Sequence, residues 1–519
     1  MLKPERGKIY FQDKNSDLIL AAGNKEWKTI IADPRAIIDP EKTAEVLSGI
    51  LKIDKNEIFK KISKKEDPYE IILKKANDEM VENIKLLDLA GIGLEPERKR
   101  IYPLGGQASQ VIGFVSYADD EERGQYGLEG FLDNEFRGEQ GLFVGEKDTS
   151  GFWIALGKRI LNPPKNGSSA VLTIDHNIQA KAELELETLK KKWGASSGHI
   201  LVIDPKIGKI LALAVNPGFD PNEYSKVKDL SIFLNPAVES VFELGSVLKP
   251  VTMAGGLDLG LVTPSTTYTD TGEVKIKGYT IKNFDGKAHG AQTMTQVLEQ
   301  SLNTGAIFVS NLVGKENFKI NLEKFGFGEK TGIDLPGEVS GNISNLNNLR
   351  DIDYATASFG QGISVTPIQM AMAISAIANG GKLIKPYIID KIIDESGAEI
   401  KKTTETKREV IKRETAETLT KMLVSVVRIG YDNRAGVRGY FVAGKTGTAQ
   451  VPKFDGKGYS DKVIHSFVGF APAFNPRFLI LIQLNDPKGN RFASNTLSPS
   501  FHNLAEYILN YYEISPDEK

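Results

Sequence analysis

The stretch "GYFVAGKTGTAQ" (439–450) fits two unlike structures, and the choice between them decides the fold. Its first eight residues match the phosphate-loop pattern G-x-x-x-x-G-K-[ST], which requires a helix that begins at the Lys-Thr pair. The supposed loop interior, residues 440–443, instead consists mainly of strand-forming residues. Gly447 and Pro452 disfavour a helix after Thr446. We therefore predict that 440–443 is strand interior and that this stretch binds no nucleotide.

Size and composition describe an ordinary globular protein. The chain has 519 residues, enough for two to four domains, with 40% apolar and 25% charged residues. Its 65 basic and 67 acidic residues give no indication of nucleic-acid binding. With no cysteine, disulfides, zinc thiolates and a cysteine nucleophile are excluded. No apolar run approaches the ~20 residues of a spanning helix, so we expect the chain as written to be soluble.

The chain divides at a linker. Residues 1–165 are mixed and loop-rich, with one amphipathic helix predicted near 77–91. "NPPKNGSS" (162–169) carries prolines and a glycine that break regular structure. We therefore predict an N-terminal domain over 1–165 and a second domain over 166–519.

The second domain has strand patterns at both ends and helical patterns between them. Asp175 is expected to cap a helix that follows the first strand. This order predicts an α+β fold with one antiparallel sheet, the terminal helices on one face, a helical block on the other, and a site between block and sheet edge. The predicted elements are a strand at 170–175, a hairpin at 199–215, helices over 240–430, strands at 437–443, 464–471 and 477–484, and a final helix at 501–512.

A serine and a lysine one helical turn apart can form a nucleophile and its base. In "FELGSVLKPVTMAGGLDLG" (242–260), Ser246 and Lys249 share a face of a predicted helix start, after a turn at Gly245. A serine hydroxyl attacks only when a base takes its proton, and a desolvated lysine can be that base. The helix N-terminus also favours developing negative charge.

Two further motifs follow in order. "LEQSLNTGAIFVSNLV" (298–313) places Ser301 and Asn303 at the start of an apolar helix. "AGKTGTAQV" (443–451) places Lys445 on a predicted strand. The chain therefore carries S-x-x-K, S-x-N and K-T-G in that order.

Chance matches to these motifs lie in other contexts. "SKVK" (225–228) is in a polar stretch, "SGN" (340–342) in a glycine loop and "KTG" (330–332) in a turn-rich segment. "GASSG" (194–198) fits the G-x-S-x-G elbow, but a helix precedes it and a strand follows, the reverse of the required order. Only one combination gives two helix starts and an edge strand. We expect two histidines, His289 and His465, to be structural.

This combination resembles the penicilloyl serine transferases, which include penicillin-binding proteins and serine β-lactamases. The resemblance covers most of the chain and is closest to class B penicillin-binding proteins, with a lean toward the division and sporulation branch. Similar to the transpeptidase domain are "LTIDHNIQ" (172–179), "DPKIGKILALAVNPGFDPNEY" (204–224), "SFGQGISVTPIQMA" (358–371) and "HSFVGFAPAFNPR" (465–477). Similar to the N-terminal pedestal, or dimerisation-like, domain are "RGKIY" (6–10), "RIYPLGGQASQVIGFV" (100–115) and "GLEGFLDNEFRGEQG" (127–141).

The resemblance implies an antiparallel sheet flanked by helices with an all-helical subdomain, and an acyl-enzyme mechanism. Ser246 would attack the carbonyl between the two terminal D-alanines of a peptidoglycan stem peptide, and Lys249 would take its proton. Ser301 would relay a proton to the leaving D-alanine, with Lys445, the fifth catalytic residue that the resemblance implies, close enough to tune it. Asn303 would hold the substrate amide and fix Lys249.

The same resemblance assigns the K-T-G strand to substrate binding. Lys445, with the hydroxyls of Thr446 and Thr448, would bind the terminal carboxylate, and Gly447 would leave room for the substrate as an added strand. The backbone N–H groups of Ser246 and Thr448 would form the oxyanion hole. No metal and no cofactor is implied.

The resemblance further implies partners and a location. We expect peptidoglycan stem peptides, β-lactam antibiotics, a membrane glycosyltransferase and division proteins as partners, a role in septal cell-wall synthesis, and no nucleic acid. The expected location is the extracytoplasmic face of a bacterial membrane. The family's N-terminal anchor normally precedes "RGKIY" closely and is absent from this sequence. We expect a soluble, trimmed form, or an anchor supplied otherwise.

Two other functions stay open at this point. A serine β-lactamase shares Ser246 and Lys249 but must activate water, and Glu338 with Asn342 faintly resembles the lactamase Glu-x-x-x-Asn loop. The surrounding "LPGEVSG" makes a structural turn the favoured interpretation, and the long N-terminal domain favours a cell-wall enzyme. A penicillin sensor or an inactive division scaffold is disfavoured because every expected catalytic residue is present.

Overall fold

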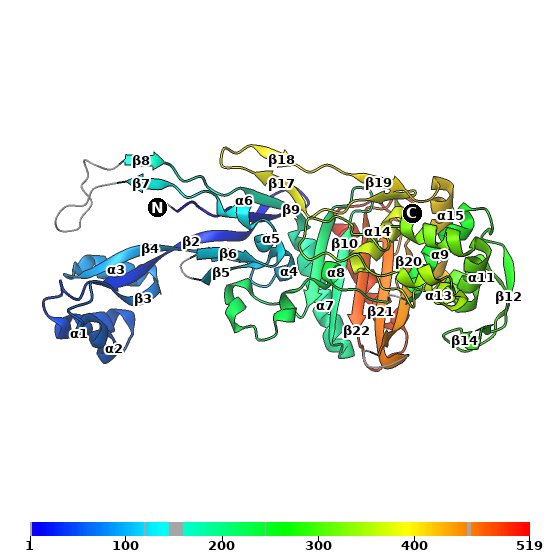
Figure 1. Ribbon diagram of the computed structural model, residues 1–519, viewed down its shortest axis with the longest axis horizontal. Helices are drawn as coiled ribbons and strands as arrows, with labels where there is room; N and C mark the ends of the chain where they lie inside the picture. Colours follow the sequence, from blue (N-terminus) through cyan, green and yellow to red (C-terminus); the bar gives the residue numbers. More distant parts are fainter. Residues whose placement is uncertain (1–2, 119–120, 145–158, 244, 454–457, 519) are drawn as a thin grey trace. The chain divides into compact units, whose positions relative to one another are not determined.

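The computed structural model describes residues 3–118, 121–144, 159–243, 245–453 and 458–518 (Figure 1). These residues form two compact units: one spans Ala22–Pro103, and the other joins Met1–Ala21 to Leu104–Lys519. The domain boundary at 165 stays a prediction.

The smaller unit is a sheet packed with three helices. Strand β2 (Leu18–Ala32) pairs antiparallel with β3 (Glu70–Ala76) and with β4 (Ile92–Ile101). Each helix starts at a side chain that accepts backbone N–H groups, as helix N-caps do; the helices and caps are α1 (Pro40–Leu51) with Asp39, α2 (Lys55–Ile62) with Asp54, and α3 (Asp78–Leu87) with Asn77. Helix α3 confirms the helix predicted near 77–91.

The larger unit is built on a five-stranded antiparallel sheet (Figure 1). Its strand order is β11-β10-β22-β21-β20, so β20 lies at one edge. The strands are β10 (Ser197–Ile203), β11 (Ile210–Asn216), β20 (Ala443–Pro452), β21 (Tyr459–Ala471) and β22 (Phe478–Asn485). They confirm the predicted hairpin and the strands predicted at 464–471 and 477–484. The first seven residues of β22 are buried, as expected for a strand covered on both faces.

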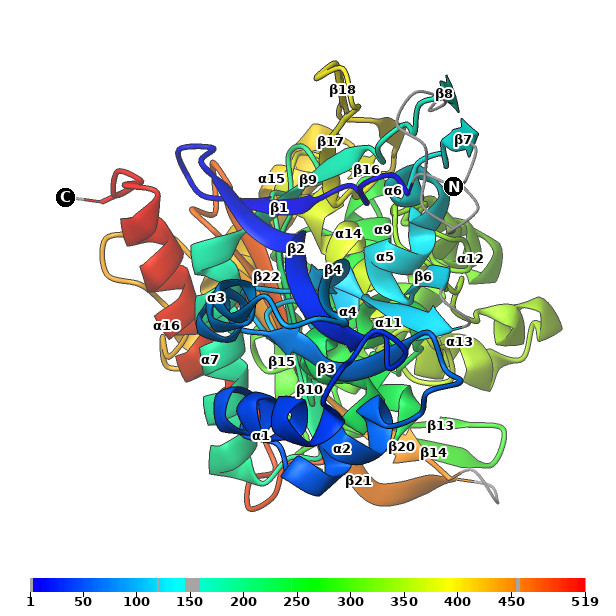
Figure 2. The same cartoon turned by 90° about the vertical axis from the view of Figure 1, so that its left-hand side faces the viewer.

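Helices cover both faces of this sheet. Helices α7 (His176–Trp193) and α16 (Ala493–Tyr511) lie together on one face, and α14 (Pro367–Ala378) packs on the other (Figure 2). This arrangement confirms the predicted layers. The final helix begins eight residues earlier than predicted, at Ala493 rather than at 501, and it contains Pro499.

Helix α7 follows its sequence signals at both ends. The Asp175 carboxylate accepts the N–H groups of Asn177 (2.9 Å) and Ile178 (3.1 Å), as predicted for a cap. Gly194 ends the helix with a φ of +56°, a left-handed conformation that suits glycine. "GASSG" is therefore a helix end followed by a strand, and not a nucleophile elbow.

The helical block between the sheet's two strand groups is confirmed, and it also holds small hairpins that the sequence did not predict. Strand β12 (Thr267–Asp270) pairs with β15 (Gly290–Thr293), and β13 (Glu273–Ile276) pairs with β14 (Tyr279–Lys282). Besides α14, the helices of the block are α8 (Pro236–Glu239), α9 (Lys249–Asp258), α10 (Met294–Glu299), α11 (Asn303–Val313), α12 (Lys315–Lys324), α13 (Asp351–Ala357) and α15 (Arg413–Ser425).

The other strands and short helices of this unit lie outside the central sheet. Strand β9 pairs in parallel with β1 and antiparallel with β17. The bounds are β1 (Ile9–Gln12), β5 (Phe114–Ala118), β6 (Glu121–Gln125), β7 (Leu142–Val144), β8 (Arg159–Asn162), β9 (Ser169–Asp175), β16 (Lys382–Ile384), β17 (Ile389–Ile393), β18 (Glu399–Lys401), β19 (Thr406–Glu409), α4 (Ser109–Ile112), α5 (Gly127–Phe131) and α6 (Asp133–Arg137).

The strand predicted at 437–443 is wrong. Strand β20 begins only at Ala443 and runs through the K-T-G residues to Pro452. The preceding backbone bonds elsewhere: Phe441 donates its N–H to the Asp517 carboxylate (2.9 Å), and the Gly439 carbonyl accepts the N–H groups of residues 517 and 518. The strand-forming side chains of 440–442 therefore lie in a loop tied to the end of the chain.

Candidate active site

Ser246 lies in a tight turn at the start of a helix. A 3-10 turn, η4 (Gly245–Leu248), leads directly into α9, whose first two residues are Lys249 and Pro250. Gly245 has a φ of +62°, and a Cβ atom there would lie 3.2 Å from the Cβ of Ala449 on β20. The turn therefore presses against the edge strand, and Ser246 is half-buried beside it.

The Lys249 side chain is 1% exposed and points to the second motif. Its Nζ lies 2.8 Å from Asn303 Oδ1 and 3.2 Å from Ser301 Oγ, and it also bonds to the Ser301 carbonyl. Burial, followed by the positive charge of Lys445, holds the pKa of Lys249 well below its usual value. Within the described residues, no hydrogen bond joins Lys249 to Ser246.

Ser301 bridges two lysines. Its Oγ lies 3.2 Å from Lys249 Nζ and 2.9 Å from Lys445 Nζ. The residue has a φ of +56°, which is uncommon outside glycine and is often found at functional sites. It lies in the turn between α10 and α11, so the predicted helix start is two residues early: α11 begins at Asn303.

Two residues that sequence reasoning missed hold the start of α11. The side-chain oxygen of Asn283 accepts the N–H of Asn303 (3.0 Å), and its Nδ2 donates to both oxygens of Asp270 (3.1 and 2.9 Å). Asp270, 2% exposed, also accepts the hydroxyl of Thr304 (2.7 Å). The Asn303 side chain donates to the Lys282 carbonyl (2.9 Å). Asp270 and Asn283 match no motif, because their partners become neighbours only after folding.

The edge strand brings Lys445 to the same point. Its Nζ, on a side chain 1% exposed, lies 2.9 Å from Ser301 Oγ, 3.1 Å from the Tyr431 hydroxyl and 3.1 Å from the Thr446 carbonyl. The Tyr431 hydroxyl also lies 2.9 Å from both the backbone nitrogen and the Oγ1 of Thr446. Sequence reasoning missed Tyr431, which follows the π-helical turn η6 (Val426–Gly430) and belongs to none of the three motifs.

Thr448 links the edge strand to α16. Its hydroxyl oxygen accepts the N–H of Ala493, the first residue of that helix (3.3 Å). Gly447 faces Ser466 on β21. The structure thus gathers the predicted residues around one strand edge: Lys249, Ser301, Asn303 and Lys445 through hydrogen bonds, and Ser246 through its turn against β20.

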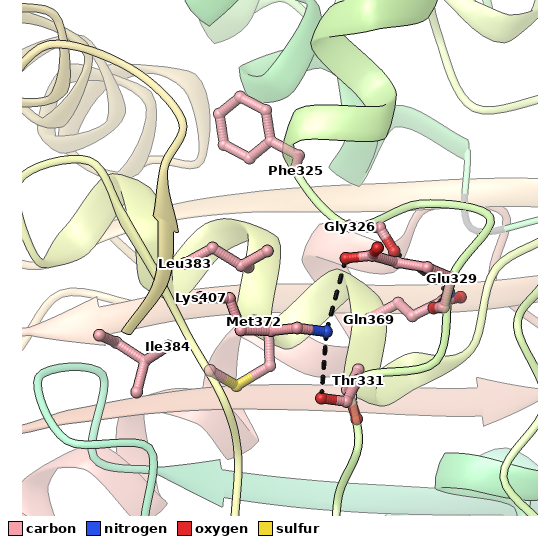
Figure 3. A pocket seen from close by; sticks show the side chains of 9 residues that line it. All are labelled: Phe325, Gly326, Glu329, Thr331, Gln369, Met372, Leu383, Ile384 and Lys407. Atoms are coloured by element: carbon pink, nitrogen blue, oxygen red, sulfur yellow. Dashed lines mark hydrogen bonds and ion pairs between the residues drawn. The ribbon is translucent and has the colours of Figure 1, made fainter. Parts of the chain in front are cut away.

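Two of the chance motif matches have other surroundings in the structure. Ser225 is exposed. Residues 330–332 form a loop whose Thr331 lines a small pocket (Figure 3), where Lys407 Nζ donates to the Thr331 carbonyl (3.4 Å). Glu338 accepts the N–H groups of Thr331 (2.6 Å) and Gly332 (3.0 Å). Its carboxylate therefore fixes a turn, as favoured above.

Two histidines lie apart from the serine motifs. His465 is buried with its Nδ1 2.9 Å from Thr496 Oγ1, and burial lowers its pKa to about 4. His289 lies 3.0 Å from the Asp285 carboxylate. Within the described residues, neither forms a hydrogen bond with Ser246.

Family models match both parts of the chain. The penicillin binding protein transpeptidase domain matches residues 198–506, and the penicillin-binding protein dimerisation domain matches residues 1–172. The chain therefore belongs to the penicillin-binding proteins with a transpeptidase domain. The expected serine-type transpeptidase fold and enzyme class are confirmed at the level of the family.

Curated relatives are similar along nearly the whole chain. Stage V sporulation protein D of Bacillus subtilis is 35% identical over 99% of this chain and 79% of its own length. A probable peptidoglycan D,D-transpeptidase, PenA of Neisseria meningitidis, is 30% identical over 99% and 86%. Peptidoglycan D,D-transpeptidase FtsI of Escherichia coli is 29% identical over 94% and 81%. These names agree with the class B resemblance.

Solved structures share the fold. Penicillin binding protein 2X of Streptococcus thermophilus superposes with a TM-score of 0.85 at 22% identity, over 99% of this chain and 81% of the other. Penicillin binding protein 3 of Mycobacterium tuberculosis, complexed with aztreonam, gives 0.77 at 27% identity over 99% and 98%. In the described part of this chain, every helix is too short or too polar to cross a bilayer.

Proposed function

We propose that this chain is a peptidoglycan D,D-transpeptidase that works through an acyl-enzyme on Ser246. The observation that carries the proposal is the position of Ser301 Oγ between Lys249 (3.2 Å) and Lys445 (2.9 Å), next to the turn that holds Ser246. This arrangement supplies a nucleophile, a buried amine and a proton relay in one place. Relatives named peptidoglycan D,D-transpeptidases support the substrate class.

The lowered pKa of Lys249 makes its neutral amine accessible. A neutral amine has two N–H groups and one lone pair. The Ser301 carbonyl and the Asn303 side-chain oxygen can only accept, so they take the two N–H groups. The lone pair then faces Ser301 Oγ, which donates to it at rest.

Acylation moves one proton from serine to the leaving amine. As Ser246 Oγ attacks the carbonyl carbon between the two D-alanines, the scissile nitrogen becomes tetrahedral and takes the proton of Ser301. This transfer frees the lone pair of Lys249, which accepts the proton of Ser246 in the same step. The C–N bond breaks, D-alanine leaves, and the Lys249 ammonium returns a proton to Ser301. The acyl-enzyme then carries an ester at Ser246.

The edge strand β20 would bind the donor peptide. Among the described residues β20 is an edge strand, which can pair with an extended substrate as a further strand, with Gly447 leaving room for the approach. The positive charge of Lys445 and the hydroxyls of Thr446 and Thr448 suit the terminal carboxylate. The N–H groups of Ser246 and Thr448 would bind the oxyanion, and the turn at Gly245, which packs against Thr448 and Ala449, favours their closeness.

An amine of a neighbouring stem peptide would attack the ester and release a cross-linked product. A β-lactam, whose amide resembles the scissile bond, would acylate Ser246 and remain. Structures of a similar protein with aztreonam and ampicillin support this inhibition.

The proposed cellular setting follows from the relatives. A sporulation protein and an FtsI protein among them support a role in septal cell-wall synthesis, with a membrane glycosyltransferase and division proteins as partners. Peptidoglycan lies outside the membrane, so we place the enzyme on the extracytoplasmic face. Fractionation of the native gene product tests this: a product found wholly in the cytoplasm contradicts the location.

A cross-linking assay tests the reaction. The donor is a stem peptide that ends in D-Ala-D-Ala, the acceptor is a second stem peptide, and released D-alanine and joined product are measured. We expect both products from the wild-type chain and from Ser225→Ala, which changes the second S-x-x-K match, and neither from Ser246→Ala. Product from Ser246→Ala, or loss in Ser225→Ala alone, contradicts the proposal.

A further inference from the structure

We propose that Glu243 is a positioning residue that holds the turn of Ser246 against the hairpin of β20 and β21. It thereby fixes the two N–H groups of the oxyanion hole. The proposal rests on the proposed function, in which Ser246 and Thr448 bind one oxyanion. Their N–H groups come from different elements, η4 and β20. Because such donors act only when both point at the same place, the two elements must keep a fixed separation.

One oxygen of the Glu243 carboxylate contacts the hairpin. Glu243 Oε2 accepts the hydrogen bond of the Tyr459 hydroxyl (3.0 Å). Tyr459 is the first residue of β21 and lies opposite Pro452, the last residue of β20. This bond therefore ties the segment just before Ser246 to the end of the edge strand. Together with the packing of Gly245 on β20, it gives the turn two attachments to the hairpin.

The other oxygen holds a loop that also touches the turn. Glu243 Oε1 accepts the N–H of Gly362 (3.1 Å). Two residues earlier in this loop, the Gly360 carbonyl accepts the N–H of Gly245 (3.1 Å). A Cβ atom on Gly360 would lie 2.2 Å from the Gly245 carbonyl oxygen, so loop and turn are in direct contact. Glu243 thus links three segments around Ser246: its own, the loop and the hairpin.

The surroundings of Glu243 show that its two bonds matter. The residue is half-buried, and burial raises the pKa of its carboxyl. A carboxylate that loses water costs free energy unless hydrogen-bond donors replace the water. Each oxygen here has such a donor, one from Tyr459 and one from Gly362. Removal of the carboxylate leaves these two donors, on separate segments, without their common acceptor.

Two substitutions at Glu243 separate the bonds from the charge. Glu243→Ala removes both bonds. Glu243→Gln can keep both, since its amide oxygen can accept from Gly362 and its amide nitrogen can donate to the Tyr459 hydroxyl. We expect Glu243→Ala to be acylated by benzylpenicillin about tenfold to a hundredfold more slowly, the scale of a misplacement of about 1 Å. It should still reach one penicilloyl group per chain, and Glu243→Gln should react at close to the wild-type rate.

Binding of a boronic acid distinguishes positioning from a general loss of structure. An alkyl boronic acid bonds through boron to the Ser246 oxygen, whose proton is released, and forms a tetrahedral anion with a B–O group at the oxyanion position. Its affinity should fall in Glu243→Ala by a factor similar to the fall in acylation rate, and should be kept in Glu243→Gln. A purely structural role would instead lower the number of acylated chains at an unchanged rate, which would overturn the proposal.

Tyr459→Phe supplies the second arm. It should slow acylation less than Glu243→Ala, because the bond from Gly362 remains. Added to Glu243→Ala, it should have no further effect, since the two residues act through one contact. Tyr69→Phe is the matched control: it removes a similar hydrogen bond, to Glu95 (2.8 Å), in the smaller unit and should be acylated normally.

Other outcomes would also contradict the role of Glu243. These are wild-type acylation of Glu243→Ala, slowed acylation with an unchanged boronic acid affinity, Glu243→Gln as slow as Glu243→Ala, or additive losses in the double variant. A Tyr459→Phe variant with the wild-type rate and affinity overturns the proposal even if Glu243→Ala does not fold. Failure of the proposed function is distinct: wild type would form no adduct at Ser246.

Discussion

Lys249 Nζ lies 2.8 Å from Asn303 Oδ1, although the two residues are 54 positions apart. The Asn303 side-chain oxygen can only accept a hydrogen bond, so this contact fixes the buried amine of Lys249 as the donor. Together with the Ser301 carbonyl, Asn303 holds the Lys249 amine beside Ser301 Oγ. The base of the proposed reaction is thus held in place before substrate arrives.

Replacing the base should stop acylation without unfolding the protein. Lys249→Met keeps the length and apolar stem of the side chain but removes the amine. We expect the rate of acylation by benzylpenicillin to fall by about 10²–10⁴, the usual contribution of a general base. Lys228→Met, in the exposed S-x-x-K match, is the control. Acylation of Lys249→Met at the wild-type rate would show that another group takes the proton.

The pH dependence of acylation should report Lys249. Burial and the charge of Lys445 lower the pKa of Lys249, so its neutral form, and the rate, should rise at a pH below the ordinary lysine range. Lys445→Met removes the positive neighbour, which eases protonation and raises the pKa of Lys249. The rise in acylation rate with pH should therefore move to higher pH, even if the maximal rate falls. A rise that moves to lower pH contradicts the electrostatic coupling between Lys249 and Lys445.

Asn283 should support both the stability of the fold and the rate of acylation. Asn283→Ala leaves the N–H of Asn303 and the buried Asp270 carboxylate without this partner, at a cost of about 1–3 kcal/mol in the free energy of unfolding. Because Asn303 fixes Lys249, acylation should also slow. The exposed Asn348→Ala is the matched control for denaturant unfolding and acylation.

A second substitution, Asn283→Asp, tests the contact with Asp270 more directly. Asn283→Asp places a second carboxylate beside Asp270, so it should destabilise more than alanine at neutral pH and less at low pH, where a carboxyl is protonated. Equal stability of Asn283→Asp and wild type at neutral pH would contradict the role of this contact.

Gly245 should tolerate no side chain, for two separable reasons. Alanine there meets a positive φ and a Cβ only 3.2 Å from that of Ala449. Gly260 has a φ of +69°, but an added Cβ would meet no described atom within 4 Å, so Gly260→Ala bears the backbone strain alone. That strain costs about 1–2 kcal/mol. We expect Gly245→Ala to lose more stability and to slow acylation, whereas Gly260→Ala should acylate normally.

The acyl-enzyme should last for hours, in contrast to a β-lactamase. Glu338 is committed to the N–H groups of Thr331 and Gly332 and is not free to activate water. Glu338→Gln should lower thermal stability, since one carboxylate oxygen becomes an amide nitrogen that cannot accept a hydrogen bond, and leave the deacylation rate unchanged. Rapid penicillin hydrolysis by wild type that Glu338→Gln abolishes would favour the β-lactamase alternative.

Local patterns predicted what depends on near neighbours. The cap at Asp175, the hairpin of β10 and β11, and the serine and lysine motifs all rest on residues close in sequence. The strand predicted before Lys445 failed because long-range bonds decide there: Phe441 bonds to Asp517, 76 residues away. The strand-forming residues of a segment do not show which other segment its backbone will bond to after folding.

The supporting residues of the site could not be predicted from the sequence for the same reason. Tyr431 meets Thr446 across 15 residues, and Asn283 meets Asn303 across 20, with no fixed spacing that a motif could record. The sequence around Ser301 favours a helix. The structure instead gives it a left-handed turn, and this turn holds its hydroxyl between two lysines.

The central claim is that Ser246 is the acylated residue. Mass spectrometry of the intact chain after incubation with benzylpenicillin, followed by peptide mapping, tests it most directly. We predict one penicilloyl group per chain, on the peptide that contains Ser246, and none on the Ser246→Ala variant. An adduct on Ser225 or Ser301, or no adduct on a folded wild-type chain, would contradict the account.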